Sequence, residues 1–183
     1  MKNKQNGFTL LELMVTVAIV GLIASIAIWN SSDMLEENRA ENFLLELKRS
    51  ITYARSQAAS TDEIVILCPA QEGAIKQAND EFECQQEWDT NKIIVVFVDA
   101  DNNGSYNVAN DALLRVIEDI PATDSLSYSG DETNLRFNTS GRITTNPGDF
   151  IYCPNNDNEN NKALTVSQSG TSFYTGDTAQ TCD

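Results

Sequence analysis

The chain has 183 residues, of which 41% are hydrophobic, so it is long enough for one domain with a packed core and additional segments. It carries 27 acidic and 12 basic residues, and its formal charge of −15 disfavours nucleic acid and anionic lipid as partners while favouring cations or basic proteins. Histidine is absent, which excludes Ser-His-Asp and Cys-His nucleophiles and every histidine metal site, so we do not expect an enzyme.

The first predicted element is an apolar helix over Phe8 to Ile28, in the stretch FTLLELMVTVAIVGLIASIAI. At about 1.5 Å per residue it would extend roughly 30 Å, the thickness of the hydrocarbon core of a bilayer. Lys2 and Lys4 precede it and acidic residues follow it, so the positive-inside rule places the N-terminus in the cytoplasm and everything after Trp29 outside. The alternative is a secretory signal peptide cut after Ala27, but the apolar core of a signal peptide usually has about 7 to 15 residues and no acid.

Glu12 is the only ionisable residue in this apolar segment. An acid in the middle of a membrane helix costs about 2.5 to 3.5 kcal/mol, somewhat less near an interface, and it usually has a polar partner or a function. The segment has no basic side chain, but a cut after Gly7 would create a free α-amino group on Phe8, close to Glu12 in sequence. The spacing alone leaves open whether these groups would pair within one chain or between neighbouring chains.

The basic leader followed by GFTLLELMVTVAIVGLIASIAI resembles the N-terminus of type IV prepilins and of the pseudopilins of type II secretion. The resemblance implies that prepilin peptidase cuts between Gly7 and Phe8 and methylates the new amine of Phe8. It also implies that Glu12 neutralises the N-terminal amine of a neighbouring subunit during filament assembly. The chain departs from many family members at Trp29, where they have a helix-kinking proline.

Beyond the apolar segment, the spacing of hydrophobic residues predicts that the helix continues as an amphipathic segment over residues 29–60. Its apolar stripe should pack on a sheet. A coiled-coil seam is the alternative, but a stripe in which half of the positions are alanine would make a weak zipper. The stripe consists of Ala40, Leu44, Leu47, Ile51, Ala54 and Ala58.

Residues 61–183 contain short β-branched and aromatic runs separated by Asn, Asp, Gly and Pro, which predicts one small antiparallel β domain. There is no fixed-period repeat and no sign of a second domain. The predicted fold class is α+β, with a long N-terminal helix, first transmembrane and then amphipathic, packed on this β domain. The predicted strands are 64–68, 92–99, 112–118, 134–138, 149–153, 163–168 and 172–175.

Four cysteines lie in the part that is expected outside the cytoplasm, which indicates two disulfides. Four thiols permit three connectivities, and the sequential one, Cys68 with Cys84 and Cys153 with Cys182, closes the shortest loops. A zinc site is the alternative, but there is no C-x-x-C pair, and an oxidising compartment disfavours free thiolates.

The loop DADNNGSYNVAND, which begins at residue 99, has the alternating oxygen ligands and the glycine of the first half of a calcium loop. The twelfth position is Asn rather than Glu, and the flanking segments are predicted strands instead of helices. The alternative is a hairpin between strands 92–99 and 112–118, in which Asn, Asp and Gly adopt positive φ. The candidate calcium ligands are Asp99, Asp101, Asn103, Asn107 and Asp111.

The segment from IVILCPA to ALLRV, with two cysteines, a tryptophan and a strand that ends in Phe-x-Asp, resembles the FimT/GspH group. FNTSGR, at residues 137–142, is similar to the later F-x-x-x-G-R turn of that group. Some members of the group resemble DNA receptors that act through basic residues near a C-terminal G-R-x-R turn. This chain has Thr171 and Phe173 where the arginines would be expected, and its acidic surface disfavours phosphate binding. We therefore do not expect nucleic acid as a partner.

The resemblance implies a pilin-like minor subunit that primes assembly of a type IV pilus or caps it. A minor pseudopilin of a type II secretion system is the alternative, and a generic anchored periplasmic protein has no need of Glu12. The implied partners are prepilin peptidase, other minor pilins or pseudopilins, and a major pilin. The implied location is the bacterial inner membrane, with the β domain in the periplasm, and then the filament tip. No cofactor is expected, apart from calcium at the loop that begins at residue 99.

Overall fold

The computed structural model has two compact units, Met1–Leu35 and Glu36–Asp183. Helix α1 (Leu10–Trp29) lies in the first unit, and helix α2 (Ser31–Thr61) contributes to the second unit from Glu36 onward. The structure describes residues 8–29, 31–71, 73–75, 81–88, 92–117, 120–130, 133–155 and 160–182.

Helix α1 presents apolar side chains on every face. Its large hydrophobic residues between Leu10 and Ile26 are 49% to 77% exposed, and a helix with this composition is stable when lipid or other protein covers it. Among the described residues, no helix has both the length and the apolar character needed to span a membrane. The structure describes the side chains of α1 as far as Ile26, and the predicted membrane span continues to Ile28. The membrane span therefore stays a prediction.

Helix α2 carries the predicted apolar stripe, and all six of its residues, from Ala40 to Ala58, are fully buried. They belong to one cluster of core side chains that also contains residues from both large sheets. The prediction that this stripe packs on a sheet is therefore confirmed, and the coiled-coil alternative is wrong because the stripe is already covered within the chain.

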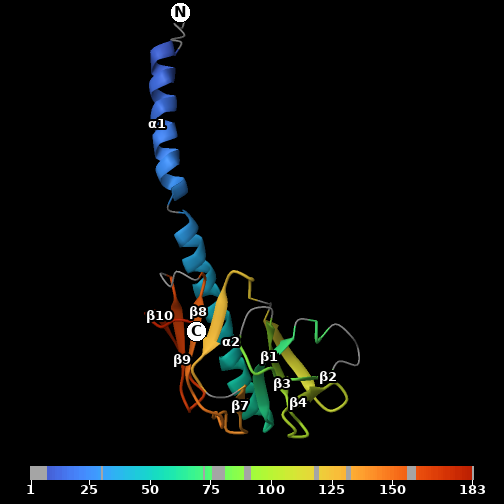
Figure 1. Ribbon diagram of the computed structural model, residues 1–183. Coiled ribbons are helices and arrows are strands. Elements are labelled where there is room, and N and C mark those ends of the chain that lie inside the picture. The colour runs from blue at the N-terminus through green and yellow to red at the C-terminus, as the bar shows by residue number, and fades with distance from the viewer. Residues whose placement is uncertain are drawn as a thin grey trace, which may run out of the picture. The chain divides into compact units, whose positions relative to one another are not determined.

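The described residues of the second unit form two four-stranded antiparallel sheets and one two-stranded sheet, with the large sheets on either side of α2 (Figure 1). The strands are β1 (Val65–Gln71), β2 (Glu81–Glu83), β3 (Lys92–Val98), β4 (Ser105–Asn107), β5 (Ala112–Ile117), β6 (Ser125–Tyr128), β7 (Leu135–Phe137), β8 (Asp149–Cys153), β9 (Lys162–Val166) and β10 (Ser172–Asp177). The strand orders are β5-β3-β1-β7, β10-β9-β8-β6 and β2-β4. The predicted α+β fold is confirmed.

The main core lies between α2 and both large sheets, where Phe137 of β7 and Phe150 of β8 are fully buried. The other face of the first sheet has a smaller core of its own. There, Phe82 of β2 and Tyr106 of β4 pack against Phe97 of β3, with ring centroids 5.8 and 5.6 Å from that of Phe97. The small β2-β4 sheet therefore covers a face of β3 that would otherwise be exposed.

Each of the seven predicted strands corresponds to an observed strand, with ends that differ by a few residues. Three observed strands were not predicted: β2, β4 and β6. Their sequences, EFE, SYN and SLSY, alternate polar and apolar side chains, but with three or four residues they are too short for this alternation to identify a strand. Pairing with a neighbour that is distant in sequence defines them instead, as when β6 pairs with β8.

Candidate functional site

The N-terminal end of α1 is capped by Thr9. The Thr9 hydroxyl accepts a hydrogen bond from the backbone N–H of Glu12 at 3.2 Å, and the Thr9 carbonyl accepts one from the N–H of Leu13 at 3.1 Å. Threonine at the cap with glutamate three residues later is the capping-box pattern, and a carboxylate in the first turn is favoured by the helix dipole. Thr9 therefore has a local structural role, as the cap of α1, that our sequence reasoning missed, although T-x-x-E was the signal for it.

The predicted processing site lies at the edge of the described part of the chain. Phe8 is 83% exposed, whereas Gly7 lies outside the described residues. The side chain of Glu12 is exposed in the first turn of α1, close in sequence to Phe8. The predicted cut and the predicted pairing of Glu12 with a Phe8 amine therefore stay predictions.

Asp99 and Asp111, two of the candidate calcium ligands, are buried and bonded to the backbone of their own loop. Asp99 accepts from the N–H groups of Asn103 at 3.0 Å and Gly104 at 3.1 Å. Asp111 accepts from those of Ala100 at 2.9 Å and of residue 107 at 2.8 Å. These bonds close the loop between β3 and β5, which are antiparallel neighbours as the hairpin alternative requires.

Three of the five candidate calcium ligands lie close together. Carboxylate oxygens of Asp99, Asp101 and Asp111 lie within 4.8 Å of one another. The side-chain oxygens of Asn103 and Asn107, however, accept from the backbone N–H groups two residues ahead, at 2.7 and 2.8 Å.

A cation already lies against the most buried of these carboxylates. Arg136 of β7 places Nη1 3.0 Å from the carboxylate of Asp99, whose side chain is fully buried. Asn102 and Gly104 adopt positive φ of 61° and 84°, as expected for a tight loop. These contacts agree with the hairpin alternative, and the calcium site stays a prediction.

The FNTSGR turn lies against the C-terminal part of α2. A Cβ on Gly141 would lie 3.0 Å from the backbone oxygen of Arg55, and a Cβ on Gly170 would lie 2.5 Å from the carbonyl oxygen of Gly141. Arg55 also donates from Nη1 to the hydroxyl of Thr171 at 3.1 Å. The motif therefore joins the helix to the β9-β10 hairpin by close backbone contact.

The positions where DNA receptors of the group carry arginine have other roles here. Thr171 accepts the hydrogen bond from the helix, and Phe173 is 55% exposed on β10. Neither side chain can neutralise a phosphate group.

A polar network holds the N-terminal part of α2 within the second unit. Arg39 donates from Nε to Asp124 at 2.5 Å and from Nη2 at 2.9 Å, and the buried hydroxyl of Tyr152 donates to the same carboxylate at 2.6 Å. Burial and the hydrogen bond to Asp124 raise the pKa of Tyr152. Lys162 is nearly buried and binds Glu37 at 2.8 Å and a second carboxylate on β10.

Two disulfides stabilise the sheets, and their pairing is the sequential one that the sequence predicted. Cys68 of β1 is bonded to Cys84, which follows β2, and Cys153 of β8 is bonded to Cys182 near the C-terminus. The first bond attaches the small β2-β4 sheet to the first large sheet, and the second attaches the C-terminal segment to the second sheet. All four cysteines are used, so no thiolate is available for zinc.

The fold is similar to that of two solved structures, both of the type IV minor pilin FimU from Pseudomonas aeruginosa strain PAO1. The first has a TM-score of 0.56 and 22% identity, and the match covers 77% of this chain and 91% of that chain. The second has a TM-score of 0.51 and 21% identity, with coverages of 73% and 90%. At these identities the likeness shows the fold. No curated protein sequence is similar enough to the chain to count as a match.

The sequence also matches two descriptions of protein families. Residues 2–28 match the prokaryotic N-terminal methylation motif, which includes Glu12 and most of α1. Residues 45–170 match the family described as type II transport protein GspH, and this range includes the C-terminal half of α2, the first large sheet, strands β6, β8 and β9 of the second sheet, and the FNTSGR turn. The resemblance found in the sequence is confirmed, and the chain belongs to the GspH family with an N-terminal methylation motif of the prepilin type.

Proposed function

We propose that the chain is a minor type IV pilin, similar to FimT and FimU, that primes assembly of a pilus or caps its tip. Prepilin peptidase would cut between Gly7 and Phe8 and methylate the amine of Phe8. The precursor would lie in the bacterial inner membrane, with its N-terminus in the cytoplasm and Glu36–Asp183 in the periplasm. Its partners would be other minor pilins and the major pilin.

The observation that carries this proposal is the apolar surface of α1, nearly all of which lies within the methylation motif at residues 2–28. Burying apolar surface stabilises by about 25 cal/mol per Å², so a helix with exposed apolar side chains on all faces gains from lipid first and from neighbouring helices in a filament later. The two disulfides agree with a periplasmic location, where thiols are oxidised.

Glu12 has two proposed roles that mutations can separate. A capping box accepts either Glu or Gln at its third helical position, so Glu12→Gln keeps the cap and removes the charge. Thr9→Ala does the reverse, because it removes the hydroxyl that accepts the Glu12 N–H and keeps the carboxylate. If Glu12 pairs with the amine of a neighbouring subunit, Glu12→Gln should impair incorporation into filaments far more than Thr9→Ala does.

The test combines mass spectrometry with sheared-filament fractions from cells. N-methyl-phenylalanine at the mature N-terminus supports the proposal, whereas an intact Met1 or a cut after Ala27 contradicts it. Both variants should remain in the membrane fraction. Normal incorporation of Glu12→Gln would refute the pairing role, and a loss confined to Thr9→Ala would indicate that the cap is what matters.

A minor pseudopilin of a type II secretion system is the second candidate, and the match to the family described as type II transport protein GspH favours it. Both candidates require the same leader, the same glutamate and a similar β domain, so a deletion strain must separate them. Loss of surface pili or twitching with normal exoprotein secretion supports the pilus, and the opposite result supports the secretion system.

A further inference from the structure

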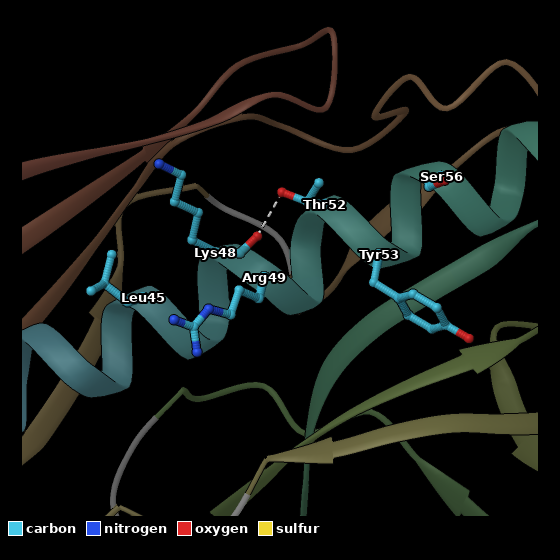
Figure 2. A pocket seen from close by; sticks show the side chains of 6 residues that line it. All are labelled: Leu45, Lys48, Arg49, Thr52, Tyr53 and Ser56. Atoms are coloured by element: carbon cyan, nitrogen blue, oxygen red, sulfur yellow. Dashed lines mark hydrogen bonds between the residues drawn. The ribbon is translucent and has the colours of Figure 1, made fainter.

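The exposed side of α2 carries an open groove that the proposed function does not use. Its volume is about 440 Å³, and all of its lining comes from the middle of the helix. Figure 2 shows Arg49 and Tyr53 leaving the helix on one side and Lys48 on another. We call this the α2 groove, and it is lined by Leu45, Lys48, Arg49, Thr52, Tyr53 and Ser56.

The α2 groove concentrates unneutralised positive charge on a chain whose net charge is −15. In the described part of the chain, Arg39, Arg136 and Lys162 are paired with carboxylates. Across the same described residues, Lys48 and Arg49 have no ion pair. A positive site on an otherwise acidic surface attracts an acidic partner and repels a basic one.

Near Arg49 on α2, two contacts of Arg115 order the side chain of Tyr53 and attach it to the sheet. Arg115 of β5 lies over the ring of Tyr53, with its guanidinium carbon 5.2 Å from the ring centroid, and donates to the buried hydroxyl of Ser50 at 3.3 Å. Tyr53 is nevertheless 39% exposed. Tyrosine and arginine dominate the energetics of protein interfaces, and side chains that are already ordered lose less entropy when a partner binds.

We propose that the α2 groove binds a glutamate- or aspartate-rich segment of a neighbouring filament subunit. Its carboxylates would contact Arg49 in the groove and Arg115, which does not line the groove but packs on Tyr53, and an apolar side chain would lie against Leu45 and Tyr53. The identity of the partner as a filament subunit rests on the proposed function. The preference of the groove for an acidic segment rests on its own side chains instead. A polyanion such as DNA fits less well, because it would extend beyond a short groove onto the acidic surface that surrounds it.

Fluorescence anisotropy with full-length protein in detergent tests this proposal. The probe is a labelled hexapeptide of four glutamates and two leucines, compared with its lysine counterpart and with a labelled oligonucleotide of similar charge. The glutamate peptide should bind best, and its affinity should fall as salt is raised from about 25 to 300 mM, because exposed charges are screened.

Two charge reversals of equal size provide the matched comparison. Arg49→Glu should weaken binding of the glutamate peptide about tenfold or more, as loss of a charged contact does. Arg142→Glu should leave binding unchanged, because Arg142 is exposed on the FNTSGR turn and does not line the groove. Arg115→Glu, with folding checked by circular dichroism, is the second test variant and should weaken binding similarly.

The results separate this proposal from the proposed function. No binding of the glutamate peptide, equal effects of Arg49→Glu and Arg142→Glu, or tighter binding of the oligonucleotide would overturn the groove proposal. Each of these results is independent of methylation at Phe8. If Phe8 is methylated but the peptide does not bind, only the groove proposal fails; if the peptide binds and Phe8 is unmodified, only the filament assignment fails.

Discussion

Gly170, between β9 and β10, offers the sharpest test of how the helix is joined to the sheets. Its φ is +76°, and a Cβ there would lie 2.5 Å from the carbonyl oxygen of Gly141 and 3.2 Å from both Arg55 Cδ and Phe137 Cε1. The nearest of these atoms belongs to the backbone, which cannot move without opening the FNTSGR turn. Gly170→Ala should therefore separate the hairpin, the turn and α2 from one another.

The expected loss of stability has two parts that a second variant can separate. A left-handed backbone costs a non-glycine residue about 1 to 2 kcal/mol, partly offset because alanine also restricts the unfolded chain. Gly176→Ala should show only this part, since φ there is +80° and nothing lies within 4 Å of an added Cβ. Gly170→Ala adds an overpacking cost of about 1 to 3 kcal/mol. We expect a total loss of about 3 kcal/mol for Gly170→Ala and about 1 kcal/mol for Gly176→Ala.

The measurement is urea unfolding of the oxidised full-length protein in detergent, followed by near-ultraviolet circular dichroism, with the free energy of unfolding extrapolated to water. Both variants are on the β9-β10 side of the second unit and differ mainly in the contact with Gly141. Equal losses for the two variants would refute the argument that close backbone contact at Gly170 holds the helix to the hairpin.

Two further predictions concern buried polar groups. Tyr152→Phe should cost about 2 kcal/mol at neutral pH, because it leaves a buried carboxylate without one of its donors. The pKa of Tyr152 is raised above its ordinary value near 10, so its contribution is present below pH 10 and is lost as pH rises through the folded-state pKa. The melting temperature of the wild type should fall as pH rises above about 10, and that of Tyr152→Phe should fall less steeply. The same dependence of melting temperature on pH in both proteins would contradict this. Arg136→Ala should cost about 3 kcal/mol in urea unfolding, because it leaves the fully buried carboxylate of Asp99 without its cation. Calcium at millimolar concentration should give no heat with the wild type in isothermal titration calorimetry, and a saturable signal would restore the calcium interpretation of this loop.

Periodic patterns in the sequence predicted the parts of the fold that depend on local chemistry. The stripe from Ala40 to Ala58 follows the helical repeat, and every member is buried as that repeat requires. The strands at 92–98 and 149–153 are long enough and apolar enough to be recognised without knowledge of their neighbours. The N-terminal motif was equally clear, since an acid in an apolar segment is rare and restricts the choice of family.

Contacts between distant residues were not predictable from the sequence in the same way. Arg39 and Asp124 are 85 residues apart, and neither has neighbours that would indicate an ion pair. The pairing of Arg136 with Asp99 changed the interpretation of the loop at residue 99, because alternating oxygen ligands look the same whether the positive charge comes from a metal ion or from a guanidinium on another strand. The spacing of residues in a sequence indicates which side chains could bind a metal ion. It does not show which other side chains of the fold, such as Arg136, interact with them instead.

The attachments of α2 bear on where a partner can bind. Arg39 and Glu37 hold the N-terminal part of the helix to groups on or near the second sheet, and Arg55 holds its C-terminal part to the β9-β10 hairpin. The buried stripe fixes the residues between these ends, so within the second unit the helix cannot move away from the sheets without loss of the core. Arg49 and Tyr53 are therefore presented on a rigid element, which favours specific binding because little conformational entropy is lost on association. An acidic partner therefore meets a fixed arrangement of positive charge at the α2 groove, whereas the acidic surface around the groove repels it.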